Sequence, residues 1–144
     1  MKRAGFLGAV IASLSTACIG GGDETSRAQP RFSEINKTIL ADRCTVACHS
    51  GGEFAAGGLD LKETPYATLL DAAPTGVECA GSPLKRVAPG DPEASLLYLL
   101  IAAKVHGEAA PCGETMPLGA ERAALTQAEV DRIRAWILAG AKND

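Results

Sequence analysis

The segment from Cys44 to His49 constrains the fold of this chain more than any other part. Two cysteines are separated by three residues, and a histidine follows the second cysteine directly. This pattern is one residue longer than the Cys-x-x-Cys-His signature, in which two thiols bond covalently to a haem. The histidine of that signature ligates the iron. We therefore expect one covalent c-type haem, with thioethers from Cys44 and Cys48 and with His49 as the proximal ligand.

The additional residue between the two cysteines affects how the haem would be attached. It must be accommodated as a bulge in the turn if both thiols are to reach the haem. If the turn cannot adapt, one thioether would form instead of two.

The N-terminus has the pattern of an export signal. Lys2 and Arg3 precede an uncharged run, residues 4–17, which is long enough for a signal sequence and too short to span a bilayer. A small residue before Cys18 resembles a bacterial lipoprotein signal, so we expect residues 1–17 to be removed and Cys18 to carry the lipid. Ordinary cleavage that leaves Cys18 free is the alternative. Residues 18–30 would form a flexible tether, and the chain would be anchored on the periplasmic side of a bacterial membrane.

Cys79 and Cys112 lie outside the haem motif. Sequence alone permits three pairings among the four cysteines that follow Cys18. If Cys44 and Cys48 hold a haem, Cys79 and Cys112 are left to form a disulfide in an oxidising compartment. The alternative is a structural lipoprotein without haem, stapled by two disulfides that include Cys44–Cys48. That alternative does not explain why a histidine follows Cys48.

Hydrophobic spacing predicts helices joined by long loops, and no strand. Apolar residues recur on one face of residues 32–43 and 126–139, and Thr126 and Glu129 form a capping box at the start of the second segment. Helices are also expected over 65–71 and 91–106, each with a proline in its first turn. The connecting segments are rich in Gly and Pro. We therefore predict a small all-α domain over residues 31–144, with three to five short helices and long loops wrapped round the haem.

Met116 is the first candidate for the second axial position of the iron. It is the one methionine left if the signal segment is removed, and thioether sulfur suits iron and raises its reduction potential. His106 is the competing ligand, and it would give a lower potential. Lys85, Arg86 and Trp136 are weaker candidates for contacts with the haem propionates, with surface charge or core packing as the alternative.

These features together resemble the bacterial single-haem c-type cytochromes of the class I fold, from about residue 31 to residue 142. The resemblance rests on Cys44, Cys48 and His49, on the segments 89–97 and 116–119, and on the last helix with its Trp-Ile-x-x-Gly-Ala ending. It looks most like lipoprotein-borne members. The resemblance implies a partly exposed haem edge and a role for Pro117 in holding the Met116 loop. The three-residue spacing between the cysteines departs from the family pattern.

The expected function is electron transfer by a single haem with His49 and Met116 as axial ligands. Small substrates would not reach an iron ligated on both sides, and the partners would be redox proteins in transient contact. A haem-based sensor or ligand-binding lipoprotein, with Met116 displaced by a ligand, is the alternative. We do not expect an enzyme, because no Ser-His-acid set, paired carboxylates or phosphate-binding glycine motif is evident.

The charge of the chain argues against nucleic acid as a partner. The formal net charge is −3, and it becomes about −5 if Lys2 and Arg3 leave with the signal peptide. No basic cluster remains to neutralise phosphates.

Overall fold

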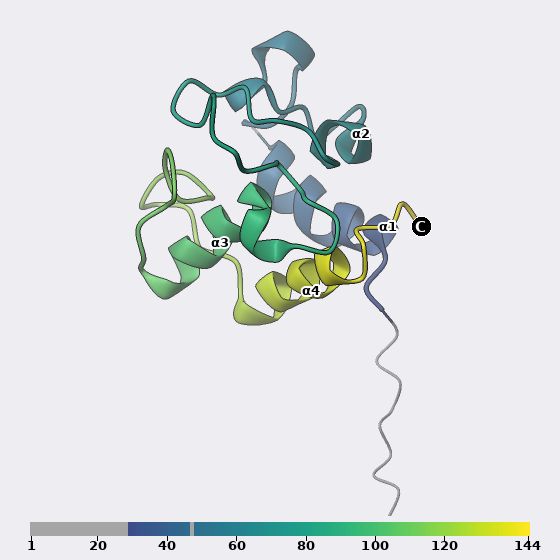
Figure 1. Cartoon of the computed structure of the whole chain (residues 1–144). Helices are drawn as coiled ribbons and strands as arrows, with labels where there is room; N and C mark the ends of the chain where they lie inside the picture. The colour runs from purple at the N-terminus through teal and green to yellow at the C-terminus, as the bar shows by residue number, and fades with distance from the viewer. Residues whose placement is uncertain (1–28, 47) are drawn as a thin grey trace, which may run out of the picture.

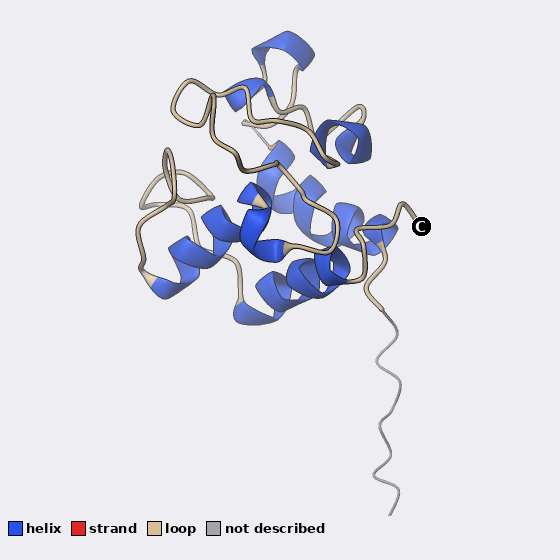
Figure 2. Ribbon diagram, in the orientation of Figure 1, coloured by secondary structure: helices blue, strands red, loops and turns tan. Residues whose placement is uncertain are grey.

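The computed structural model of the chain describes residues 29–46 and 48–144. The predicted signal peptide, the lipid attachment at Cys18 and nearly all of the tether lie outside the described residues. The described part is mostly helical and contains no β-strand (Figure 2). The expectation of a small, mainly α domain is therefore confirmed. Isolated bridges join Leu70 to Val87, Lys85 to Ser95 and Ala88 to Asp91.

The first helix runs directly into the segment with the cysteines and the histidine. α1 (Phe32–Ile35) continues into the π-helix η1 (Asn36–Thr45) without an intervening loop. One face of the combined helix buries the apolar side chains that predicted it, namely Phe32, Ile35, Ile39 and Leu40. The helix extends two residues beyond the predicted end at residue 43, so Cys44 lies in its last turn.

The last helix, α4 (Gln127–Leu138), begins at the predicted capping box. The Thr126 hydroxyl accepts a hydrogen bond from the backbone N–H of Glu129, and the Glu129 carboxylate accepts one from the N–H of Thr126 at 2.7 Å. Both bonds satisfy donors that would otherwise lack a partner at the helix start. Gly140 follows the helix with φ of 93°, in the left-handed region expected for its C-terminus.

The two ends of the domain meet in an aromatic core. The Phe32 ring lies 5.1 Å from the ring of Tyr66 and 5.3 Å from the ring of Trp136, between ring centroids. The Trp136 indole N–H donates to the carbonyl of Lys142 at 2.9 Å. The N–H of Phe32 donates to the carboxylate of Asp144, also at 2.9 Å. The C-terminal tail therefore closes over the start of α1, as Figure 1 shows.

The middle helix starts later than predicted. The expected helix over 91–106 is divided into a short 3₁₀ turn, η4 (Pro92–Ala94), and α3 (Leu96–His106). Ser95, between them, is extended and fully buried. Its hydroxyl donates to the carbonyl of Asp91 at 2.7 Å and accepts from the N–H of Ala88 at 2.8 Å. The prediction of one helix from Asp91 was wrong, because these contacts hold Ser95 against the 85–88 segment.

The long segment between the first and middle helices contains only short turns. These are the 3₁₀ turns η2 (Gly52–Phe54) and η3 (Ala56–Gly58), and the short helix α2 (Pro65–Leu69). α2 begins at the predicted proline and ends two residues before the predicted end. Within this segment Leu61 is buried and Leu59 is half-buried against the core.

The helices and the loops occupy different parts of the molecule. In Figure 1, α1 with η1, α3 and α4 pack together, and the segment that carries α2 arches over one side of them. The loop that follows α3 extends on another side of α3. None of the helices among the described residues has the length and apolar composition needed to cross a bilayer.

Candidate functional site

An apolar cavity of about 420 Å³ lies between these elements, and every residue predicted to hold the haem contributes to its wall. Cys44 comes from the end of η1, and Cys48 and His49 follow it. Met116 comes from the loop between α3 and α4. The volume is in the range of cofactor pockets in proteins. The fold therefore brings together four side chains that are as many as 72 positions apart in the sequence.

His49 is held in an orientation that suits a metal ligand. Its ring Nδ1 lies 3.0 Å from the carbonyl oxygen of Ala56. A carbonyl oxygen only accepts hydrogen bonds, so Nδ1 carries the proton and Nε2 keeps a free lone pair. Burial lowers the pKa of His49 below its usual value and favours the neutral imidazole. A histidine that ligates a metal usually donates its other ring N–H in this way.

Backbone hydrogen bonds fix the position of His49 on the cavity wall. The N–H of His49 donates to the carbonyl of Cys44 at 3.1 Å, and the N–H of Leu61 donates to the carbonyl of His49 at 2.8 Å. The N–H of Ala56 donates to the carbonyl of Cys48 at 2.9 Å. The segment with the two cysteines is therefore tied both to the end of η1 and to the loop that follows it.

Cys44 and Cys48 are both free thiols on the cavity wall. The alternative with a Cys44–Cys48 disulfide is therefore not seen in this fold. Burial raises the pKa of Cys44 to about 11, so this thiol stays protonated near neutral pH. Both sulfurs remain available for a covalent bond.

Met116 lies on the same cavity, whereas the competing ligand His106 does not. The N–H of Met116 donates to the carbonyl of Leu100 in α3 at 3.1 Å, and the side chain is partly buried against the core. Pro117, which also lines the cavity, follows through a cis peptide bond. His106 is exposed at the end of α3, and its Nε2 lies 3.2 Å from the side-chain oxygen of Gln127. Of the two candidates, only Met116 faces the site.

The apolar wall of the cavity explains the composition of α3. Its apolar residues, which include Leu96, Leu97, Leu99, Leu100 and Ile101, lie on most sides of the helix. Ile101, Ala102 and Ala103 are buried, and Leu96, Leu97, Leu100 and Ile101 line the cavity. One side of α3 therefore packs on the core and the other forms the wall. The even spread of its apolar residues was the signal in the sequence for a site on this helix.

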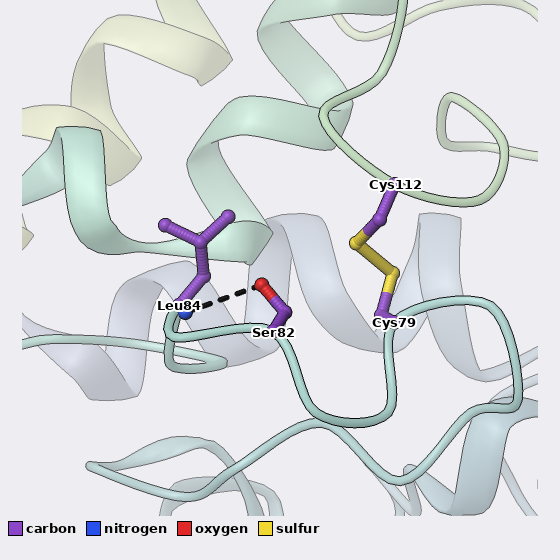
Figure 3. Close-up of a disulfide and its surroundings, with 4 residues drawn as sticks. All are labelled: Cys79, Ser82, Leu84 and Cys112. Atoms are coloured by element: carbon purple, nitrogen blue, oxygen red, sulfur yellow. Dashed lines mark hydrogen bonds between the residues drawn. A yellow bond between two sulfur atoms is a disulfide. The ribbon is translucent and has the colours of Figure 1, made fainter.

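The predicted disulfide between Cys79 and Cys112 is present and also borders the cavity. It joins the loop before the middle helix to the loop that carries Met116, and Figure 3 shows the sulfur–sulfur bond between these two loops. On the first loop, the N–H of Leu84 donates to the hydroxyl of Ser82 at 3.2 Å, which closes a local turn (Figure 3).

Arg86 lies on the cavity wall, and Lys85 and Trp136 do not. The Arg86 guanidinium donates to the carbonyls of Thr68 and Gly58, each at 3.0 Å, and to the hydroxyl of Thr75 at 2.8 Å. Gly58 has φ of 63°, and a Cβ there would lie 2.5 Å from that hydroxyl. Arg86 therefore joins α2, η3 and the loop at Thr75 beside the cavity.

The other two candidates for propionate contacts have different partners. Lys85 is near Asp71, with 3.7 Å between the ammonium nitrogen and the carboxylate, and both side chains are substantially exposed. Trp136 is 1% exposed and uses its indole N–H on the carbonyl of Lys142. The structure thus favours core packing as the role of Trp136.

Two further arginines on the cavity wall were not identified from the sequence. They are Arg43, whose guanidinium donates to the carbonyl of Ala124 at 3.2 Å, and Arg122. Nothing in the spacing of these residues distinguishes them from surface arginines.

The donor set on this wall fits a haem. A haem held here could take its iron ligands from the His49 nitrogen and the Met116 sulfur, its thioethers from Cys44 and Cys48, and its packing surface from the apolar wall between them. Within residues 29–46 and 48–144, no group of three His, Cys, Asp or Glu side chains gathers to hold a bare metal ion. Searches against protein-family models, curated proteins and solved structures found no match for this chain.

Proposed function

We propose that this chain is an electron-transfer protein that carries one covalent c-type haem. The observation that supports the proposal most is the convergence of Cys44, Cys48, His49 and Met116 on one apolar cavity. Cys44, Cys48 and His49 are all separated from Met116 by the middle of the chain. A structural lipoprotein would have no need to place two thiols, an imidazole and a thioether on a shared apolar wall.

Each residue of this set has a role that its surroundings support. Cys44 and Cys48 would hold the haem covalently, and His49 would ligate the iron through Nε2 because Ala56 occupies Nδ1. Met116 would be the second axial ligand, held in place by its hydrogen bond to α3 and by the disulfide four residues before it. The bound haem would supply one-electron redox chemistry.

The proposal also covers the setting of the protein. With both axial positions supplied by His49 and Met116, the haem centre would exchange electrons with other redox proteins through brief contacts, without a substrate at the iron. The chain would act on the exported side of a bacterial membrane, held there by a lipid on Cys18. We do not propose an enzymatic activity or a nucleic-acid partner.

The proposal is tested by producing the full chain in a host with a cytochrome c maturation system. We expect covalent haem that persists on a denaturing gel, one haem per chain in a pyridine haemochrome assay, and reversible one-electron reduction. The reduced protein should not bind carbon monoxide without denaturant, because Met116 holds the sixth position.

Two results would contradict the proposal in different ways. A chain that folds and retains the Cys79–Cys112 disulfide but contains no haem would indicate a structural lipoprotein. A haem-loaded chain that binds carbon monoxide readily would indicate a sensor or ligand-binding protein. The variant His49→Ala is the matched control for iron ligation, and Lys85→Ala is the control for a change outside the cavity wall.

A further inference from the structure

We propose that a π-type turn accommodates the additional residue of the Cys44–His49 segment, so that both cysteines form thioethers. This inference rests on the proposed function, and it concerns how the chain presents its two thiols. The alternative is that only Cys48 bonds covalently and that Cys44 remains a free thiol.

The hydrogen bond across the segment carries the inference. The N–H of His49 donates to the carbonyl of Cys44 at 3.1 Å, which spans five residues. An α-helical turn closes over four residues, and a π-turn closes over five. A motif with two residues between the cysteines has four positions from the first cysteine to the histidine, and this motif has five. The motif is longer by one residue, and the hydrogen bond that closes its turn spans one more residue. The wider turn therefore accommodates the added residue.

The preceding helix has the same widened geometry. η1 is a π-helix from Asn36 to Thr45, so Cys44 enters the segment from a helix that is already wider than an α-helix. η1 ends at Thr45 and Val46 is extended, with φ of −62° and ψ of 113°, so the bond between His49 and Cys44 closes a separate turn of the same five-residue width directly after the helix. π-turns in proteins occur frequently at functional sites.

The side chains around the turn lie where the inference requires them. Cys44, Cys48 and His49 all line the cavity. Val46, between the two cysteines, is 61% exposed and does not line it. Val46 therefore lies on the outer side of the turn while both thiols stay at the cavity.

The covalent step is balanced without any additional reagent. Each thiol adds across a vinyl group of the haem: the sulfur bonds to one vinyl carbon, and the proton goes to the other. The carbon–carbon double bond becomes a single bond, and no electrons are gained or lost overall. The step requires two free thiols, which Cys44 and Cys48 supply.

The experiment compares the haem-loaded full chain with Cys44→Ala, Cys48→Ala and a deletion of Val46 that restores two-residue spacing. The α-band of the pyridine haemochrome moves to the red when one thioether is missing. We expect the natural chain and the deletion to share one α-band position, and both Cys→Ala variants to be shifted to the red. Val46→Thr keeps the spacing and should match the natural chain.

A second readout follows the thiol directly. Trypsin cleaves after Arg43 and Lys62, which places both cysteines in one peptide. We expect no alkylation of that peptide by iodoacetamide in the natural chain, and none in the haem-loaded Cys→Ala variants, because their one remaining cysteine holds the haem. Insertion of a glycine after Val46 should release one thiol, since the turn would then need to close over six residues.

The outcomes separate this inference from the proposed function. If the natural chain has the α-band of Cys44→Ala and one alkylated cysteine, haem is bound but the π-turn does not present both thiols, and the inference is wrong. Two thioethers in the glycine insertion would also overturn it, because the width of the turn would not matter. If the natural chain contains no haem, the proposed function fails as well.

Discussion

Single residues hold the loops around the cavity in place, and Asp60 is one of them. Its carboxylate accepts hydrogen bonds from the N–H groups of Gly52 at 2.6 Å, Lys62 at 2.8 Å and Glu63 at 3.3 Å. These bonds link both ends of the loop that follows His49. The donors Lys62 and Gly52 lower the pKa of Asp60, because they stabilise its charged form.

We predict that Asp60→Asn makes the chain less stable near neutral pH and less sensitive to acid. A folded-state pKa below the unfolded value of about 3.9 means that the stabilisation is present above that pH. It is lost as the pH falls through the folded pKa. The free energy of unfolding, measured with denaturant from pH 3 to pH 7, should differ most between the natural chain and Asp60→Asn near pH 7.

The exposed Asp42 supplies the control for Asp60. Asp42→Asn removes the same charge without removing hydrogen bonds from the backbone, and its effect should be within about 0.5 kcal/mol at any pH. Equal effects of the two substitutions would contradict the role given to Asp60.

The two candidates for the second iron ligand, Met116 and His106, also differ as single residues, because only Met116 lines the cavity. We predict that Met116→Ala, in the haem-loaded chain, opens the iron to carbon monoxide and lowers the reduction potential, because the thioether ligand is lost. His106→Ala should leave both properties unchanged, since His106 is exposed and outside the cavity. Carbon monoxide difference spectra and a redox titration of the two variants would check this. The reverse result would make His106 the ligand.

At the scale of elements, the disulfide connects the loop before the middle helix to the loop that carries the sulfur ligand. The bridge spans 33 positions. Closing a loop of that length in the unfolded chain is worth about 3–4 kcal/mol in an entropic model. Met116 follows Cys112 by four residues, so the bridge restrains the Met116 loop as well as the fold.

We predict that Cys79→Ser with Cys112→Ser lowers the free energy of unfolding by about 3 kcal/mol. The loosened loop should also weaken or remove the near-infrared band between ferric iron and methionine sulfur. Mild reduction of the natural chain should have the same effect on the band. An unchanged band after complete reduction, verified by thiol counting, would show that the bridge stabilises the fold without restraining Met116.

The helices differ in how well their boundaries follow from the sequence. The start of α4 was predicted correctly because the capping box is a local arrangement of Thr126 and Glu129. The start of α3 was not, because Ser95 is held extended by bonds to Ala88 and Asp91. Ser95 is 0% exposed, so a helix starting at Asp91 would leave its buried hydroxyl without these hydrogen bonds. An unpaired buried hydroxyl costs free energy, and the extended backbone at Ser95 avoids that cost.

At the scale of the whole molecule, the described residues are arranged around two features, an apolar core and the cavity beside it. The core joins Phe32, Tyr66 and Trp136 to the C-terminal tail. The cavity, by contrast, is walled mainly by loops, by one side of α3 and by the end of η1. Loops that bury little surface against each other gain most from a large apolar group between them.

We predict that covalent haem raises the melting temperature of the whole domain. A gain of about 1 kcal/mol in the free energy of unfolding raises the Tm of a domain of this size by roughly 4 °C. A covalently held haem should stabilise the fold by several times that free energy. We expect the haem-loaded chain to melt at least about 10 °C above the same chain made without maturation, followed by circular dichroism. The variant with Cys44, Cys48 and His49 all replaced by Ala should melt with the unmatured chain. Equal Tm values for the loaded and unloaded chains would show that the loops are stable without the group.

The sequence by itself determined those features that depend on neighbouring residues. These are the helical periodicity of the first and last helices, the capping box, the proline at the start of α2, and the adjacency of Cys48 and His49. It also reduced the three possible disulfide pairings to Cys79 with Cys112, on the expectation that Cys44 and Cys48 bind haem. Each of these depends on residues a few positions apart or on the number of cysteines.

The tertiary structure alone decided which distant residues meet. It placed Met116 on the cavity and His106 outside it, assigned the Trp136 indole N–H to Lys142, and put Arg43, Arg86 and Arg122 on the cavity wall. The sequence predicted only a bulge of unknown form in the haem motif, and the structure shows a turn closed by the hydrogen bond from the His49 N–H to the Cys44 carbonyl. Spacing along a chain limits which residues share a helical turn. It does not determine how loops of 15 or more residues fold back on one another, because that depends on contacts between segments far apart in sequence.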